Sequence, residues 1–172
     1  MIHVLGKLFR LGLALVFIAM VAGSGVTAQQ PITVCATGCT HTSIQEAISA
    51  VPDGSEIQVK AGTYTESLTI SRPVSLVGEG LDTTILEGAV AIAATQVSLT
   101  GFTVKGQGIQ VKDSTTITLL NDAIIESSSD GLSIANSTAV TVQGNKIRSN
   151  TGSGVVITPT SQAVFTGNVM TG

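Results

Sequence analysis

Short runs in which every second residue is apolar recur along most of the chain. Examples are "LTI" at 68–70, "VSL" at 97–99 and "LSI" at 132–134. A period of two is typical of a β-strand with one buried face. Gly, Asn and Ser gather between the runs, and these residues favour tight corners. The pattern therefore predicts many short strands that turn sharply into one another.

The last third of the chain repeats itself with a spacing of 23 residues. When residues 109–131, 132–154 and 155–172 are aligned, the apolar residues fall into shared columns. A repeat of this length is typical of stacked structural units. Because each unit contains short strands, we expect coils of a parallel β-solenoid that lie ~4.8 Å apart. Four apolar columns are predicted: Ile109, Leu132 and Val155; Val111, Ile134 and Ile157; Leu119, Val142 and Phe165; and Ile124, Ile147 and Met170.

The same alternation continues upstream with looser spacing, over 68–88 and 89–108. Together these segments predict an all-β solenoid of about five coils within residues 55–172. The side chains expected to point inward in the two earlier coils are Leu68, Ile70, Val74, Leu76, Ile85, Ile92, Val97, Leu99, Phe102 and Val104.

One column of the repeat is polar, and it contains Asp122, Asn145 and Asn168. Asn side chains that stack in register hydrogen-bond from one coil to the next. We therefore expect a structural ladder at one corner of the coil. Phe102 takes this place in the preceding coil, so the ladder is not expected to run the whole length.

A single helix is predicted before the strands, and "PDG" at 52–54 ends it. Ser43 and Glu46 have the spacing of a capping box. A lone amphipathic helix at this place is expected to cover the open apolar end of the first coil, so residues 29–54 form an N-terminal cap. The apolar stripe of the helix consists of Ile44, Ala47, Ile48 and Val51.

The first 28 residues have the pattern of a secretory signal peptide. Lys7 and Arg10 precede the uncharged run 11–23, and cleavage is expected between Ala28 and Gln29. The run has 13 residues, fewer than the ~20 that span a bilayer, which disfavours a membrane anchor. The mature chain is therefore expected outside the cell or in a periplasm.

Charge and composition exclude some classes of partner. Without Lys7 and Arg10, six basic residues remain against 11 acidic ones, a net charge of about −5. Such a chain offers no basic surface to nucleic acid or to an acidic membrane. Trp is absent, and the abundance of Val, Ile, Thr, Ser and Gly is typical of β-structure packed from small and branched side chains.

The two cysteines of the chain, Cys35 and Cys39, lie in "CATGC". In an exported protein the plain interpretation is a disulfide that closes a small loop. The alternative is a pair of metal ligands. His41 alone does not complete such a site, so no metal is expected there.

The segment "CTHTSIQEAISAVPDGSEIQVKAGTYTESLTISRPVSLVGEG" (39–80) resembles the opening of right-handed parallel β-helix proteins of the pectin-lyase-like group. The repeats at 109–172 are similar to the repeats of the same group. The resemblance covers nearly all of the expected mature chain and implies right-handed coiling. It leaves the function open, because this fold serves lyases, hydrolases, esterases, epimerases and adhesins.

Gly62, Tyr64 and Glu66 match a Gly-x-Tyr-x-Glu motif of pectin methylesterases. The later motifs that supply the catalytic aspartates, glutamines and arginine of those enzymes are missing, as is the Gly-His-Gly segment of polygalacturonases. The motif is therefore interpreted as architectural: Tyr64 covers an edge, and Glu66 faces solvent or an adjacent loop. No catalytic residue and no cofactor are predicted, and calcium would enter only if the chain were a lyase.

No column of the regular coils presents two acidic residues, which acid–base hydrolysis of a glycoside requires. Lys146 and Arg148 stand two positions apart and point outward beside the inward Ile147. Two neighbouring cations suit an acidic sugar. They are the predicted substrate-binding pair, and the alternative is an ordinary solvated strand face.

The favoured function is an exported, non-catalytic β-helix module that binds polysaccharide or a cell-surface component through a flat, Ser-, Thr- and Asn-rich exterior. The first alternative is a fragment of a carbohydrate-active enzyme, pectate lyase-like or pectin esterase-like, whose active-site residues are missing. The second is a periplasmic accessory protein. The last coil ends at "VMTG" without a cap, so a further coil or cap, from a longer chain or a partner, is expected to cover this end.

Overall fold

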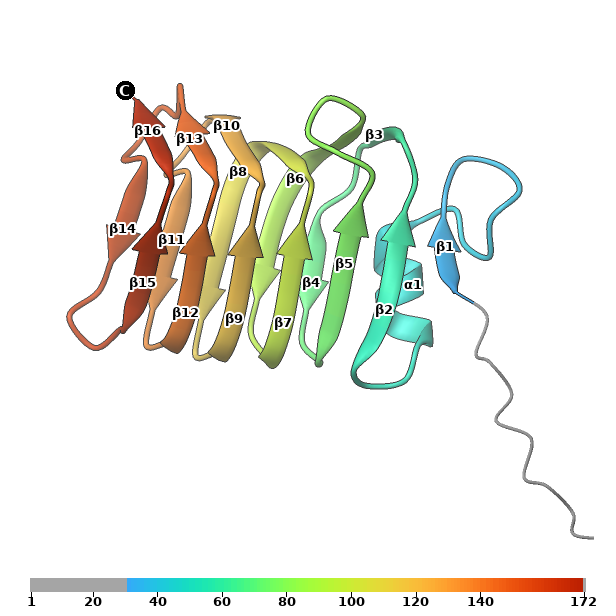
Figure 1. Cartoon of the computed structure of the whole chain (residues 1–172), viewed down its shortest axis with the longest axis horizontal. Coiled ribbons are helices and arrows are strands. Elements are labelled where there is room, and N and C mark those ends of the chain that lie inside the picture. Colours follow the sequence, from blue (N-terminus) through green and yellow to red (C-terminus); the bar gives the residue numbers. More distant parts are fainter. Residues whose placement is uncertain (1–30, 172) are drawn as a thin grey trace, which may run out of the picture.

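The structure, a computed structural model, describes residues 31–171 as a parallel β-solenoid of about six turns (Figure 1). The predicted all-β, right-handed parallel β-helix is confirmed. There is about one turn more than expected, because the segment after the helix already forms a coil of its own. The expected signal peptide, residues 1–28, lies outside the described residues.

The strands form two sheets. The seven-stranded first sheet has the order β1 (Ile32–Val34), β2 (Ser55–Val59), β5 (Val74–Gly78), β7 (Thr95–Thr100), β9 (Thr115–Leu120), β12 (Thr138–Gln143) and β15 (Ala163–Thr166). The nine-stranded second sheet contains β3 (Gly62–Tyr64), β4 (Leu68–Ile70), β6 (Thr84–Ile92), β8 (Thr103–Lys112), β10 (Ala123–Ser127), β11 (Leu132–Ala135), β13 (Lys146–Arg148), β14 (Val155–Ile157) and β16 (Val169–Thr171).

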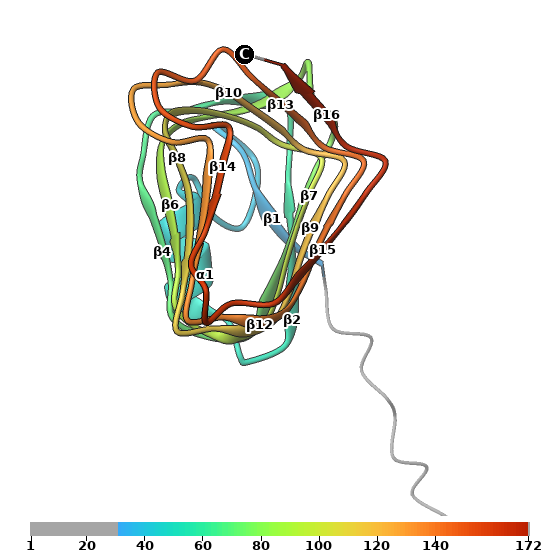
Figure 2. The same ribbon diagram turned by 90° about the vertical axis from the view of Figure 1, so that its left-hand side faces the viewer.

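The second sheet bends and so forms two sides of the tube, which Figure 2 shows in a view along the stack. β6 and β8 run through the bend, since β6 pairs with both β3 and β4, and β8 pairs with both β10 and β11. The first sheet forms the remaining side. All strand pairs are parallel, as expected when each coil lies on the one before it.

The four predicted apolar columns are confirmed by the register of the strands. Leu119 pairs with Val142, and Val142 pairs with Phe165. Each such column lines the interior of the tube with one side chain per coil, except that in the last coil Ile157 and Met170 are 44% and 49% exposed. The interior is therefore a continuous stack of apolar side chains, and their order is the one that the 23-residue repeat predicts.

The predicted inward side chains of the two earlier coils are buried, with one exception. The prediction for Ile85 is wrong: Leu86 is fully buried and pairs with Val104, whereas Ile85 pairs with Thr103 in the neighbouring column. Ile85 and Leu86 are adjacent, so an alternating pattern can start from either. The neighbours in space, not the sequence, decide which of the two points inward.

Residues 31–171 contain one short helix, α1 (Ile44–Ala50), which lies at the N-terminal end of the stack (Figure 1). Its predicted apolar stripe is buried and joins the core cluster. Seven residues are too few for a stable isolated helix. The helix therefore depends on this packing and on the groups that cap its first turn.

The corner between the first sheet and the second is made by a left-handed residue. φ is +80° at Gly101, +54° at Asn121, +67° at Gly144 and +64° at Gly167. Each of them directly precedes Phe102 or one of the predicted ladder residues. Gly and Asn tolerate this conformation, so the corner turns sharply and holds the next side chain in a fixed place.

Candidate binding surfaces

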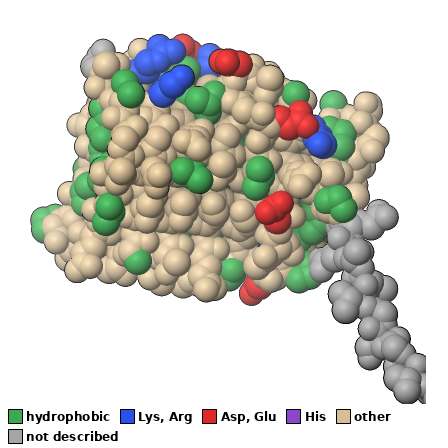
Figure 3. All heavy atoms as spheres, in the orientation of Figure 1, with side chains coloured by type: hydrophobic (Ala, Val, Ile, Leu, Met, Phe, Trp, Pro, Cys, Tyr) green, Lys and Arg blue, Asp and Glu red, His purple; other side chains and the backbone are tan. Residues whose placement is uncertain are grey.

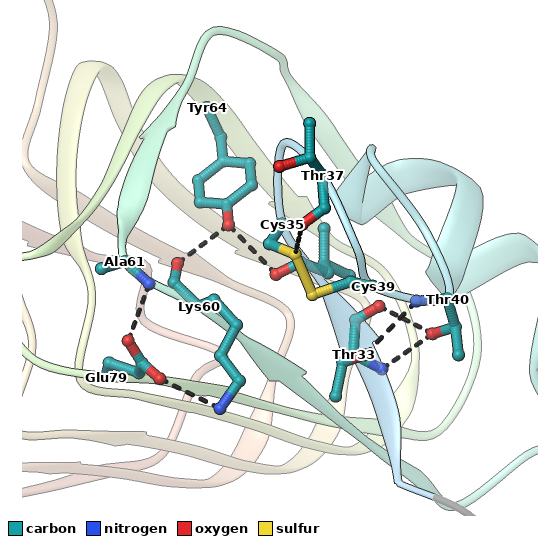
Figure 4. Close-up of a disulfide and its surroundings, with 10 residues drawn as sticks. Thr33, Cys35, Thr37, Cys39, Thr40, Lys60, Ala61, Tyr64 and Glu79 are labelled. Atoms are coloured by element: carbon teal, nitrogen blue, oxygen red, sulfur yellow. Dashed lines mark hydrogen bonds and ion pairs between the residues drawn. A yellow bond between two sulfur atoms is a disulfide. The ribbon is translucent and has the colours of Figure 1, made fainter.

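The Gly-x-Tyr-x-Glu motif belongs to the scaffold of the N-terminal end. The Tyr64 ring is buried, and its hydroxyl lies 2.8 Å from the Lys60 carbonyl oxygen and 3.2 Å from that of Val34 (Figure 4). Burial raises the pKa of Tyr64, and the carboxylates of Glu79 and Glu66 add to this effect. The hydroxyl therefore stays protonated and joins the first coil to the strand before it.

The expectation for Glu66 is wrong, because its carboxylate is engaged at the start of α1. One oxygen accepts hydrogen bonds from Ser43 Oγ at 2.7 Å and from the Gln45 backbone N–H at 3.0 Å. The other accepts from the Ile44 N–H at 2.9 Å. The first N–H groups of a helix have no partner within the helix, and an anion there is favoured by the helix dipole.

Ser43 is the N-cap residue, as predicted, and its Oγ accepts from the Glu46 backbone N–H at 3.2 Å. The carboxylate that completes the cap comes from Glu66 on the first coil rather than from Glu46. A hollow of about 360 Å³ lies beside this site, lined by Ser43, Tyr64 and Glu66 among others. Since the Glu66 oxygens are taken by the helix, the motif fits an architectural role.

The predicted disulfide is present between Cys35 and Cys39, with a Cα–Cα distance of 5.5 Å. Figure 4 shows it in the loop that follows β1. The loop also returns to β1 through the backbone: the Cys35 N–H donates to the His41 carbonyl, and the His41 N–H donates to that of Thr33. The disulfide thus closes a loop whose base is already hydrogen-bonded.

The structure brings Asp122, Asn145 and Asn168 into one column at the left-handed corner. Asn145 Oδ1 accepts from the Asp122 backbone N–H at 2.7 Å, and Asn168 Oδ1 accepts from the Asn145 N–H at 2.9 Å. The column begins beneath Phe102, whose N–H donates to Asp122 Oδ1 at 2.9 Å. Asp122 and Asn145 are fully buried, so the column is part of the interior and not a surface site.

The outward face of the first sheet carries a row of hydroxyl groups. Ser75, Ser98, Thr118 and Thr141 are paired in successive strands; Glu56 on β2 precedes them in this column, and Val164 ends it. Among residues 31–171 the hydroxyls of these four side chains have no hydrogen-bond partner. The neighbouring outward column is also uncharged and consists of Val77, Thr100, Leu120, Gln143 and Thr166.

Figure 3 views this face directly. Its middle carries scattered apolar side chains, the Lys and Arg side chains gather at its upper edge, and acidic side chains stand toward its N-terminal side. A shallow hollow of about 440 Å³ lies on the face between β5, β7 and β9, and its lining includes Ser75, Gln96, Ser98 and Thr118. The two central columns from β5 to β15 therefore form an uncharged, only shallowly hollowed surface that can form hydrogen bonds.

The spacing of residues along the chain reveals only part of the hydroxyl row. The signal was present, because Thr118 and Thr141 fall in one column of the 23-residue repeat. Ser75 and Ser98 are also 23 residues apart, but Ser98 and Thr118 are separated by 20, so only the observed register joins the two halves of the row.

The predicted binding pair, Lys146 and Arg148, is exposed on β13 with Ile147 buried between them. Their columns continue with Ala123 and Ile125 on one side and with Val169 and Thr171 on the other. Lys105 lies on the same sheet two coils away, but its Nζ is 3.1 Å from a Glu126 carboxylate oxygen. The basic pair is therefore an isolated charged spot at the end of the stack.

The third side of the tube belongs to the second sheet and is formed by β4, β11, β14 and the second halves of β6 and β8. Its central outward column consists of Thr69, Ala91, Gln110, Ser133 and Val156. In residues 31–171 no three His, Cys, Asp or Glu side chains lie close enough together to hold a metal ion. The same residues contain no helix of the length and apolarity that crossing a membrane requires.

The family model described as "Right handed beta helix region" matches residues 21–172. A search of the curated proteins finds no match. The solved structure of pectate lyase Pel9A is similar, with 17% identity and a TM-score of 0.58 over 82% of this chain and 48% of the lyase. A mutant pectin methylesterase in complex with a hexasaccharide has 14% identity and a TM-score of 0.49, over 66% of this chain and 52% of the esterase.

The chain thus spans about half the length of these two enzymes. At 17% identity the likeness to the lyase shows a shared fold alone. The family model, in contrast, spans most of the sequence. The protein therefore belongs to the right-handed β-helix family and has a pectin-lyase-like fold.

Proposed function

We propose that the chain is an exported module that binds neutral polysaccharide without cleaving it, through the outward face of the first sheet. The observation that carries this proposal is the row of Ser75, Ser98, Thr118 and Thr141. Its four hydroxyls point outward from successive strands and have no partner within the described residues. Hydroxyls in this setting are free to exchange hydrogen bonds with water for hydrogen bonds with a ligand.

The ligand class follows from energetics and charge. A hydrogen bond gained in place of water contributes only about 0.5–1.5 kcal/mol, so a single sugar would bind weakly. Strands repeat every ~4.8 Å, and an extended repeating chain meets many such groups at once. No ionised side chain stands in the two central columns of β5 to β15, which favours an uncharged polymer over an acidic one.

Export is part of the same proposal. It is supported by the predicted leader at residues 1–28 and by the Cys35–Cys39 disulfide, since disulfides persist in oxidising compartments.

The test uses insoluble neutral β-glucan and the full mature chain in a depletion binding assay. The double variant Thr118→Val and Thr141→Val removes two hydroxyls and keeps the branched shape that strands favour. Roughly tenfold weaker binding is expected. Thr63→Val is the matched control, because Thr63 is exposed on β3 of the second sheet. Equal binding by the double variant and the control would refute the assignment of the face.

A second candidate ligand is an acidic polysaccharide at Lys146 and Arg148. The exposure of both cations on one strand favours it, and Arg is well shaped for a carboxylate. In the same assay with polygalacturonate, Lys146→Gln with Arg148→Gln would abolish binding if this pair were the site. Variants of the hydroxyl row would then have no effect.

The enzyme alternative is tested directly. The chain spans about half of the pectate lyase whose fold it shares, so lyase or esterase activity is kept as an alternative proposal. Appearance of unsaturated product from polygalacturonate in the presence of calcium, read by ultraviolet absorbance, would overturn the non-catalytic proposal.

A further inference from the structure

Asp122 is the first member of a column whose other members are asparagines. In Asn145 and Asn168 the side-chain oxygen accepts the backbone N–H of the previous member of the column, at 2.7 and 2.9 Å. Asp122 Oδ1 does the same for the Phe102 N–H at 2.9 Å. One half of the carboxyl group therefore acts as the amide oxygen does.

The other half of each asparagine donates a hydrogen bond. Asn145 Nδ2 donates to the Leu119 carbonyl at 2.9 Å, and Asn168 Nδ2 donates to the Val142 carbonyl at 2.8 Å. Each acceptor stands three residues before the previous member of the column. By the same rule the acceptor for Asp122 is the Leu99 carbonyl, and the register agrees, since Leu99 pairs with Leu119 and Leu119 with Val142.

Asp122 Oδ2 takes the place of the donating Nδ2. It is buried and has no hydrogen-bond partner among the described residues. An ionised carboxylate only accepts hydrogen bonds, so it would present a second acceptor to a buried carbonyl. A buried polar atom left in that state is costly.

We infer that Asp122 carries a proton on Oδ2 in the folded protein and donates it as a hydrogen bond to the Leu99 carbonyl. The side chain then replaces an asparagine in shape and in both hydrogen bonds. The stack is complete only in this form, so its stability depends on pH.

The surroundings of Asp122 favour the neutral form. Burial raises its pKa well above the ordinary value and outweighs the backbone N–H groups of Phe102, Leu120 and Gly101, which lower it. The side chains next to it in the column, Phe102 and Asn145, do not titrate. No ionised side chain is among the main causes of the shift.

A proton on Asp122 makes the folded chain less stable as the pH rises. In the unfolded chain Asp122 loses its proton near pH 4, whereas the folded protein keeps it. The folded state binds the extra proton above that pH, so the stability from Asp122 is complete in acid and is lost as pH rises to the folded pKa. The unfolding equilibrium constant rises by up to about tenfold per pH unit over this window.

The experiment compares urea unfolding of the native chain and of Asp122→Asn from pH 4 to pH 9. The unfolding constant of the native chain divided by that of Asp122→Asn is expected to grow steadily toward alkaline pH, because the amide of the variant donates its hydrogen bond at every pH. Asp113→Asn is the matched control on the same coil, since Asp113 is exposed, and its ratio should stay flat. A flat ratio for Asp122→Asn, or one that falls with pH, would overturn the inference.

A second measurement does not depend on a variant that folds. Carboxyl-carbon NMR of the native chain, labelled at its aspartates, is expected to show one resonance that keeps the protonated shift at neutral pH. If every aspartate is ionised at neutral pH, Asp122 is not a donor and the inference fails.

Discussion

Removal of the Glu66 carboxylate is expected to loosen the N-terminal helix and to lower the stability of the whole chain. Three donors converge on this group: Ser43 Oγ and the backbone N–H groups of Ile44 and Gln45, at 2.7–3.0 Å. In Glu66→Ala the two backbone groups lose their partner. Since α1 has only seven residues, about two turns, it keeps few hydrogen bonds of its own that could hold its start in place.

The loss of unfolding free energy in Glu66→Ala can be worked out from these three hydrogen bonds. Hydrogen bonds to a charged group contribute about 1.5–3 kcal/mol each, but the site is only half-buried and water replaces part of the loss. We expect Glu66→Ala to lower the free energy of unfolding by about 2–3 kcal/mol. At about 3–4 °C per kcal/mol for a chain of this size, the Tm falls by about 6–12 °C.

The assay is thermal and urea unfolding followed by circular dichroism, with hydrogen exchange at Ile44 and Gln45 as a local readout. Glu46→Gln is the matched control, because the sequence alone makes Glu46 the capping partner of Ser43. Glu46 is exposed in the structure, so its variant should shift the Tm by no more than about a degree. A larger loss in Glu46→Gln than in Glu66→Ala would refute the reasoning.

Three further outcomes are expected. Asn145→Ala leaves the buried Asp122 N–H and Leu119 carbonyl unpaired, so it should lower the free energy of unfolding in urea by about 3 kcal/mol. The control Gln143→Ala replaces an exposed side chain and should change this free energy little. Equal losses in the two variants would contradict the role of the column. Reduction of the Cys35–Cys39 disulfide, or its double replacement by Ser, should remove about 2 kcal/mol from stability and expose residues 36–38 to protease; an unchanged urea midpoint would count against this. Val164 and Val169 of the last coil are 63% and 58% exposed, and strand edges with apolar side chains associate. Replacing both by Thr should therefore reduce concentration-dependent self-association in sedimentation. A native chain that stays monomeric at every concentration would contradict this prediction.

The sequence by itself determined the solenoid, its columns and its interior. In a stack of coils every residue lies on its equivalent in the next coil, so a period along the chain becomes a period in space. This is why Leu119, Val142 and Phe165 could be placed over one another from their spacing alone. The disulfide followed in the same way from the nearness of Cys35 and Cys39 in the chain.

The tertiary structure alone decided what depends on contacts between unlike segments. The partner of the α1 cap is Glu66, 23 residues from Ser43 and outside the repeat, and no local spacing marks it. The choice between Ile85 and Leu86 as the inward side chain depended on the register against Val104. The hydroxyl row joins coils of unequal length, and the unpaired oxygen of Asp122 is visible only beside the asparagines stacked on it. A repeat constrains each residue relative to its equivalents, but the ends of the stack and the groups that face one another across it are set by packing.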